Sequence, residues 1–278
     1  MTTHTEHSNQ AIDSEQHVLL HYPQAGVAEL ILNRPEKHNA FDDAIIQKML
    51  DKLDEAERNP QTRILVLKSN GKHFSAGADL SWMKRMAQNS HADNLQDAAK
   101  LAELMRALNH FRCPTIALIQ GATYGGAVGL AACCDIVLAQ DNARFCLSEV
   151  KIGLTPATIS PYVIRAIGER QARRFFLTAE VMSSADALQI GLVHKVLDSF
   201  DALNDAAETM IQQLSQNSPQ ATKASKTLIF SVSQQDISTK LIQHTTQCIA
   251  DIRVSEEGQE GLNAFLNKRR PAWVSKEK

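Results

Sequence analysis

Two glycine-containing segments are where this sequence could do chemistry. Half of the 12 glycines lie between positions 71 and 129: Gly71, Gly77, Gly121, Gly125, Gly126 and Gly129. Glycine lets the backbone approach a ligand closely or adopt a positive φ angle. Two of the clusters, around Gly77 and around Gly125–Gly126, fall between a predicted strand and a predicted helix, and a helix N-terminus offers unpaired N–H groups and partial positive charge. Each cluster could therefore hold an anion or stabilise a developing oxyanion.

Neither cluster matches a nucleotide-binding motif. The spacing Gly121-x-x-x-Gly125-Gly126 is not G-x-G-x-x-G, and the sequence contains no G-x-x-x-x-G-K-[ST]. Taken alone, each cluster is also compatible with a tight turn that lets a strand pack closely on a helix. The presence of both together favours a site.

The elements that must position these segments are strands and helices in alternation. Asp42–Asn59, the region of Leu101–Leu108 and Ala127–Cys134 have helical patterns. Strands are predicted at His17–Leu20 and Val27–Leu32, which form a hairpin, and at Ile64–Leu67, Thr115–Ile119, Ile136–Ala139, Ala143–Leu147 and Val193–Leu197. This alternation indicates an α/β fold with stacked sheets.

The C-terminal part of the sequence differs from the rest because no strand pattern follows residue 200. Four helices are predicted there, at 200–215, 219–230, 236–252 and 256–268. We therefore predict a domain boundary near 200–216, with a core at 17–199 and a helical segment at 200–278.

Composition excludes several classes of protein. The chain has 278 residues, of which 44% are hydrophobic and 22% charged. These values are those of ordinary globular proteins and argue against a disordered, collagenous or membrane-spanning chain. Its net charge of −2 gives no overall field that would attract nucleic acid or anionic lipid. The five cysteines contain no C-x-x-C pair, which favours buried thiols in a reducing compartment. Residues 1–16 have no targeting pattern and are predicted to be a disordered tail on a cytoplasmic protein.

Five ordered motifs together resemble one family. Phe74–Leu80 and Gly125–Ile136 are similar to the paired segments of the enoyl-CoA hydratase/isomerase (crotonase) family. Three further segments support the resemblance: Leu32–Ala40, Glu149–Pro156 and Gly261–Arg269. The similarity covers about residues 17–270. It implies a spiral of ββα units, followed by a helical C-terminal segment that assembles a homotrimer or a dimer of trimers.

The resemblance also implies the site. It assigns the oxyanion hole to the backbone N–H groups of Ala78 and Gly126, and the acid/base role to Glu149. The residues expected to contact the acyl-CoA are Arg34, Lys37, Ala40, Ala76, Asp79, Leu80, Trp82, Gly125, Gly129 and Lys268. CoA is part of the substrate, so no separate cofactor and no metal is expected.

Several of these residues also have an ordinary structural interpretation. Asp79 is predicted to cap a helix, and Asp135 to hydrogen-bond a turn. Cys133 and Cys134 are interpreted as small core side chains. Trp82–Met86 is either an amphipathic loop packed on the core or a lid over the acyl group.

The sequence departs from the family at one catalytic position. Most hydratases of the family carry a second glutamate where this chain has Gly129. We hypothesise that Gly129 makes room for a branched acyl group with its own carboxylate, whose charge is neutralised by Lys84, Arg85 or Arg165.

The leading function is hydration of 3-methylglutaconyl-CoA in leucine breakdown. It is favoured because Ala78–Met86, Gly125–Ile136 and Ser160–Val163 look most like a bacterial group with that activity. Isomerisation of a Δ3-enoyl-CoA to the Δ2 isomer needs only one carboxylate, and Gly129 favours it. RNA binding, which some similar hydratases show, and an inactive acyl-CoA-binding scaffold are further alternatives. The scattered cations give RNA binding little support.

Overall fold

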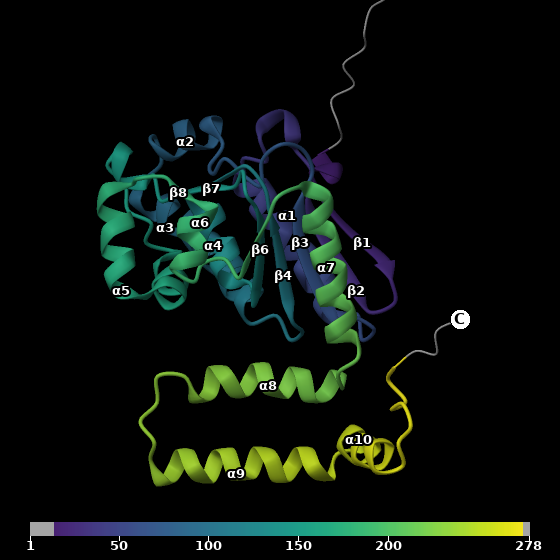
Figure 1. Cartoon of the computed structure of the whole chain (residues 1–278). Coiled ribbons are helices and arrows are strands. Elements are labelled where there is room, and N and C mark those ends of the chain that lie inside the picture. The colour runs from purple at the N-terminus through teal and green to yellow at the C-terminus, as the bar shows by residue number, and fades with distance from the viewer. Residues whose placement is uncertain (1–13, 275–278) are drawn as a thin grey trace, which may run out of the picture.

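A six-stranded sheet runs through the upper body of the molecule (Figure 1). The structure is a computed structural model that describes residues 14–274. The strands lie in the order β1 (Val18–Gln24), β2 (Val27–Leu32), β3 (Ile64–Ser69), β4 (Thr115–Ile119), β6 (Ile136–Gln140) and β9 (Lys195–Leu197). The first two form the predicted antiparallel hairpin, and the other neighbouring pairs are parallel. Every residue of β4 is buried, as expected for a central strand covered on both faces.

A second, three-stranded sheet lies beside the glycine segments. It has the order β5 (Ala122–Tyr124), β7 (Arg144–Cys146) and β8 (Met182–Ser183). An isolated bridge joins Ser75 to Thr123 and thereby brings the Phe74–Leu80 segment alongside β5. Sequence analysis predicted β7, which lies within the longer apolar run Ala143–Leu147, but not β5 or β8.

Helices pack around these sheets and enclose one large hydrophobic core. They are α1 (Asp43–Arg58), α3 (His91–Asn109), α4 (Gly126–Cys133), α5 (Ser160–Thr178) and α6 (Ser184–Gln189), with three short 3₁₀ helices, η1 (Ser14–His17), η2 (Pro35–Lys37) and η3 (Glu149–Ile152). Cys133 and Cys134 are buried as predicted, and burial raises the pKa of the Cys134 thiol to about 12.

The interpretation of Trp82–Met86 as a loop is wrong. These residues belong to a helix, α2 (Leu80–Met86). Asp79 is its N-cap, as predicted, and its Oδ1 atom accepts hydrogen bonds from the backbone N–H groups of Ser81 and Trp82.

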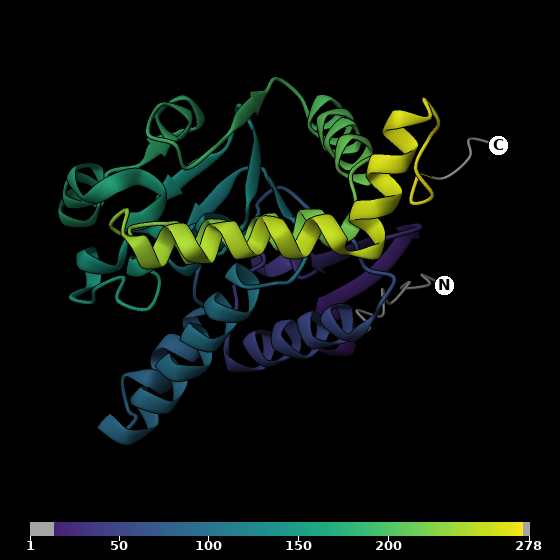
Figure 2. The same ribbon diagram turned by 90° about the horizontal axis from the view of Figure 1, so that it is seen from below.

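Four helices form the C-terminal part of the chain, and Figures 1 and 2 show that the last three make a layer below the body. They are α7 (Phe200–Ser215), α8 (Pro219–Val232), α9 (Thr239–Val254) and α10 (Glu256–Leu266). The first packs on the sheet through Leu203, Ala207 and Ile211. Within residues 14–274, no strand follows β9, so the helical C-terminal segment of the predicted fold is confirmed.

A partly buried ion pair joins this layer to the sheet. The Nζ atom of Lys226 in α8 lies 2.7 Å from Oδ2 of Asp135 and donates to the carbonyl oxygen of Cys113 at 3.1 Å. The same Asp135 oxygen accepts hydrogen bonds from the backbone N–H and hydroxyl of Thr115. Asp135 therefore anchors α8 as well as the turn before β6.

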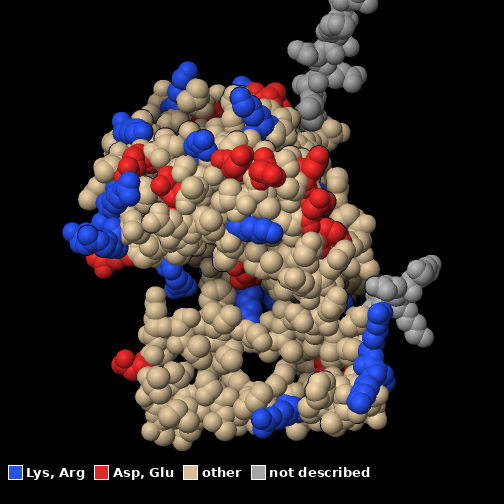
Figure 3. Space-filling model, viewed as in Figure 1, with Lys and Arg blue, Asp and Glu red and all other residues tan. Residues whose placement is uncertain are grey.

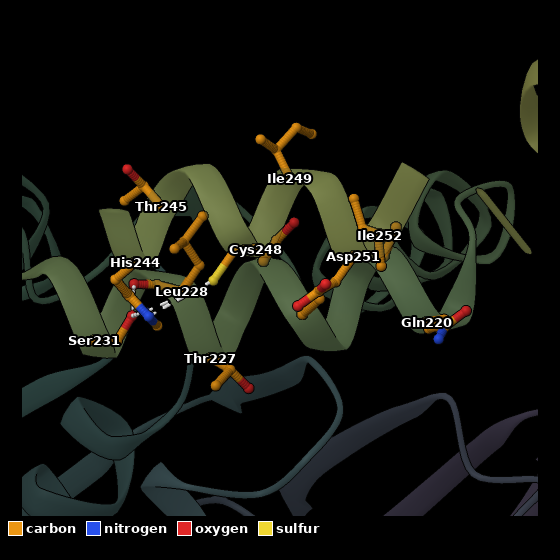
Figure 4. A pocket seen from close by; sticks show the side chains of 13 residues that line it. Gln220, Thr227, Leu228, Ser231, His244, Thr245, Cys248, Ile249, Asp251 and Ile252 are labelled. Atoms are coloured by element: carbon orange, nitrogen blue, oxygen red, sulfur yellow. Dashed lines mark hydrogen bonds between the residues drawn. The ribbon is translucent and has the colours of Figure 1, made fainter. Parts of the chain in front are cut away.

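Helices α8 and α9 flank an open apolar cavity of about 490 Å³ (Figure 4). Leu228, Cys248, Ile249 and Ile252 line it, as does His244, whose ring contacts the Ser231 hydroxyl and the Cys248 sulfur. Figure 3 shows few charged side chains on the visible face of this layer, whereas Lys, Arg, Asp and Glu are interspersed over the body above it. Assembly through this segment stays a prediction.

The remaining features concern the ends and the thiols. The predicted disordered tail, 1–16, lies outside the described residues as far as position 13, and Ser14–His17 form η1. All five cysteines are free, and Cys248 is the one that is partly exposed. In residues 14–274, no helix has the length and apolar character needed to cross a membrane.

Candidate active site

The backbone N–H of Ala78 is free within residues 14–274 because the hydrogen bonds to the neighbouring segment are made by the residues on either side of Ala78. Phe41 donates its N–H to the carbonyl oxygen of Gly77 at 3.0 Å, and Asp79 donates its N–H to the carbonyl oxygen of Phe41 at 3.0 Å. These bonds fix the residues on both sides of Ala78, whose own N–H has no acceptor in the described part of the chain. Gly77 has φ +97°, a conformation that side chains rarely adopt, so a glycine is needed there.

The second free N–H is that of Gly126, the first residue of α4. The preceding Gly125 has φ +56°, and its N–H donates to the carbonyl oxygen of Cys146 at 2.8 Å. The first N–H groups of a helix have no intrahelical partner, and that of Gly126 has no other acceptor within residues 14–274. Ala78 and Gly126 line the same cavity of about 370 Å³, so two free donors are available to one ligand.

Glu149 of η3 lies on the wall of this cavity. Its Oε1 atom is 3.2 Å from the point where a Cβ atom would stand on Gly125. Its Oε2 atom is buried and has no hydrogen-bond partner among residues 14–274. Burial raises the pKa of Glu149, so this carboxylate accepts a proton more readily than an exposed glutamate does. Two N–H donors and one basic carboxylate thus meet in one cavity.

The rest of the cavity wall is mostly apolar. It includes Ala76, Gly125 and the predicted contacts Leu80 and Trp82, together with Phe41, Met83, Met86, Ala98, Leu101, Ile152 and Leu154. Among its polar side chains are Asn94 and Asp97 of α3. Sequence analysis missed the α3 face formed by Asn94, Asp97, Ala98 and Leu101. Their spacing marks one helix face, but nothing in it indicates that the face borders a cavity.

Three residues predicted to contact the acyl-CoA, Arg34, Lys37 and Ala40, lie in the loop before α1 and do not line the cavity. Arg34 is half-buried, and its Nη1 atom lies 3.3 Å from Oδ2 of Asp79 and 3.5 Å from Oδ2 of Asp42. Burial alone would raise the pKa of Asp79, but the α2 N–H groups and Arg34 lower it. Arg34 therefore joins this loop to α2. The carbonyl of Ala40 accepts a bond from Arg34, and Lys37 is exposed.

Lys268 is not brought to the cavity within one chain. It follows α10 in the lower layer, whereas α2 lies at the opposite end of the body (Figure 1). Since α8–α10 extend away from the sheet, a contact of Lys268 with CoA in the same chain is not supported.

The expectation that Gly129 makes room for the acyl group is wrong. Gly129 is buried and is not among the residues that line the cavity. A Cβ atom on Gly129 would lie 2.3 Å from Cγ2 of Ile159 and 3.2 Å from Sδ of Met105. The space beside Gly129 is already filled by Ile159, which precedes α5.

The expected cations are not at the cavity either. No lysine or arginine lines it in the part of the chain that the structure describes. Arg85 instead pairs with Asp43 on α1, and Lys84 and Arg165 are exposed. Lys84 falls on the face of α2 that points away from Trp82, and the ion pair with Asp43 directs the Arg85 side chain toward α1.

Comparison with known proteins decides the family. A model of the enoyl-CoA hydratase/isomerase family matches residues 23–276. The chain belongs to the enoyl-CoA hydratase/isomerase family. This crotonase-family chain is similar to the crystal structure of an enoyl-CoA hydratase from Shewanella pealeana, with 48% identity, a TM-score of 0.90 and coverage of 95% of this chain and 100% of the other.

Two curated relatives represent the two activities in the family's name. A 2,3-dehydroadipyl-CoA hydratase of Escherichia coli is 32% identical, with 89% of this chain and 95% of the relative covered. A trans-2-decenoyl-[acyl-carrier-protein] isomerase of Streptococcus mutans is 30% identical, with 93% and 98% covered. The crotonase fold, with its α/β body and helical C-terminal segment, is thereby confirmed, and an acyl-CoA substrate is consistent with the family.

Proposed function

We propose that this crotonase-family chain hydrates an α,β-unsaturated acyl-CoA whose acyl group ends in a free carboxylate, namely 3-methylglutaconyl-CoA. The observation that carries the chemistry is the placement of Glu149, whose Oε2 atom is buried and has no partner among residues 14–274, in the cavity lined by Ala78 and Gly126. The similarity of Ala78–Met86 and Gly125–Ile136 to methylglutaconyl-CoA hydratases supports this acyl group. So does the relative named for 2,3-dehydroadipyl-CoA, since adipic acid is a dicarboxylic acid.

The hydration step needs one proton carrier. The thioester oxygen gains negative charge as water attacks C3, and the N–H groups of Ala78 and Gly126 stabilise that charge. Glu149 takes a proton from the attacking water and delivers a proton to C2. One O–H bond of water and the C2=C3 π bond break while C3–O and C2–H bonds form, and the product is 3-hydroxy-3-methylglutaryl-CoA.

A specific observation favours isomerisation as a second candidate. Ile159 occupies the space beside Gly129, where many hydratases of the family have another glutamate. Glu149 alone could remove a proton from C4 and return it to C2, and one relative is named as an isomerase.

Mass spectrometry of a substrate panel separates the two activities. The purified chain is incubated with 3-methylglutaconyl-CoA, crotonyl-CoA and a Δ3-enoyl-CoA. Hydration adds the mass of one water, whereas isomerisation leaves the mass unchanged and moves the double bond. We expect hydration, with 3-methylglutaconyl-CoA as the best substrate. Isomerisation of the Δ3 substrate without hydration of the others would contradict the proposal.

A further inference from the structure

One residue that lines the acyl cavity has a buried hydrogen-bond donor that the proposed reaction does not use. In the described residues, five buried side-chain polar atoms have no partner: Thr62 Oγ1, Arg63 Nε, Trp82 Nε1, Thr123 Oγ1 and Glu149 Oε2. Of these residues, Trp82 and Glu149 line the active-site cavity. The acid/base role accounts for the free oxygen of Glu149, but the indole N–H of Trp82 has no such role.

Burying the indole N–H of Trp82 without an acceptor lowers the stability of the folded chain. Trp82 is only 6% exposed, and a buried indole N–H ordinarily finds an acceptor. The other tryptophan of the chain follows that pattern, because Nε1 of Trp273 donates to the carbonyl oxygen of Gln216 at 3.0 Å. A phenylalanine at position 82 would supply a similar apolar ring without the unsatisfied donor. This contrast indicates that the acceptor for Trp82 arrives with the ligand.

The chemistry of the cavity limits what that acceptor can be. In the proposed reaction, the thioester oxygen already accepts hydrogen bonds from the N–H groups of Ala78 and Gly126. The acceptor is therefore an oxygen further along the acyl group. No lysine or arginine lines the cavity in the described residues, so a distal carboxylate must be bound by neutral donors. A hydrogen bond from a neutral N–H to a carboxylate is charge-assisted and strong.

We propose that the indole N–H of Trp82 binds the distal carboxylate of the acyl group and so selects dicarboxylic over monocarboxylic acyl-CoA substrates. This inference rests on the proposed function and names the residue that sets its substrate class. Met83 and Met86 line the cavity next to Trp82, and their flexible thioether chains can rearrange to admit the carboxylate.

The kinetic test compares two tryptophan variants on two substrates. Trp82→Phe removes the N–H and keeps an aromatic ring, and Trp273→Phe is the matched control. The substrates are 3-methylglutaconyl-CoA and 3-methylpent-2-enoyl-CoA, in which a methyl group replaces the carboxylate. We expect Trp82→Phe to lower kcat/KM for the carboxylated substrate about tenfold or more, and to change the uncharged one less than threefold. Equal losses on both substrates, or no loss on either, would overturn the proposal.

A binding test separates this inference from the proposed reaction. In the Trp273→Phe chain Trp82 is the sole tryptophan, so its fluorescence reports on the cavity. The probes are the unreactive 3-methylglutaryl-CoA and 3-methylpentanoyl-CoA. We expect the carboxylated probe to bind about tenfold more tightly and to shift the emission, even if the chain proves to be an isomerase. Equal affinities would refute the role of Trp82 even if 3-methylglutaconyl-CoA is hydrated.

Discussion

The Oε1 atom of Glu149 lies 3.2 Å from the point where a Cβ atom would stand on Gly125. Residue 125 also has φ +56°, so both the backbone conformation and the carboxylate exclude a side chain there. The absence of a side chain lets Glu149 lie directly against the turn that presents the N–H of Gly126. The acid/base group and the oxyanion donor are thus positioned by the same glycine.

Replacing Glu149 by glutamine should stop the reaction without preventing binding. Glutamine has nearly the same shape but cannot carry a proton to C2. We expect kcat to fall about 10²-fold or more, with the Kd for an unreactive acyl-CoA changed less than threefold. Steady-state kinetic assays measure kcat, and calorimetry measures the Kd. Retention of wild-type kcat would remove Glu149 from the mechanism.

The raised pKa of Glu149 also predicts a dependence of stability on pH. Burial raises the pKa of this carboxyl above its ordinary value of 4.5 in the folded chain. The folded state then binds more protons than the unfolded state, so Glu149 makes the free energy of unfolding fall as pH rises through the folded pKa. Glu149→Gln should therefore gain stability relative to the parent between pH 4 and pH 7. Urea denaturation at both pH values checks this, and an unchanged or reversed difference would show that Glu149 is not desolvated.

The oxyanion role of Gly126 can be tested with a pair of variants. Gly126→Pro removes the N–H, and proline is tolerated at the first position of a helix. Gly126→Ala keeps the N–H but adds the same Cβ atom, which would meet Cζ of Phe41 at 2.8 Å. We expect the proline variant to lose about 10²–10³ in kcat relative to the alanine variant. Circular dichroism confirms that both fold, and equal kcat values in the pair would contradict the role.

Sequence patterns located the catalytic segments because their signals are local. The strand predicted at Thr115–Ile119 matches β4 exactly, and the buried helix predicted at Ala127–Cys134 is α4 displaced by one residue. The glycines and Glu149 stood out by type and spacing. The placement of the two N–H donors, in contrast, depends on contacts between separate parts of the chain that no local pattern specifies: the bridge between Phe41 and Ala78, and the hydrogen bond from Gly125 to Cys146.

The incorrect expectations about the acyl pocket concern the directions of side chains in the folded chain. Gly129 was predicted to leave room for the acyl group because it has no side chain, but the Ile159 side chain fills that room. Lys84 and Arg85 are adjacent to a pocket residue in sequence, yet a helix directs neighbouring side chains to different faces. Sequence analysis predicted Trp82 only as a contact of the acyl group. The structure adds that its indole N–H has no hydrogen-bond partner among the described residues.

Asp97 tests whether Glu149 is the sole acid/base group. Its carboxylate lines the same cavity and accepts a long hydrogen bond of 3.5 Å from Nδ2 of Asn89. If Glu149 carries the proton alone, Asp97→Asn should keep kcat within about threefold. The loss of a negative charge should lower KM for 3-methylglutaconyl-CoA a few-fold, since like charges repel. A fall in kcat comparable to that of Glu149→Gln would instead assign the reaction to two carboxylates.

The contact between Gly129 and Ile159 predicts a compensating pair of variants. Gly129→Ala places a Cβ atom 2.3 Å from Cγ2 of Ile159, so overpacking should lower the free energy of unfolding by about 1–3 kcal/mol. Ile159→Ala leaves a cavity and should cost about 2–5 kcal/mol. Because the added methyl group then occupies vacated space, the double variant should lose less than the sum of the two single losses. Urea denaturation of the four chains measures the coupling. Strict additivity would mean that the two side chains do not compete for this space, and the position beside Gly129 would again be open to an acyl group.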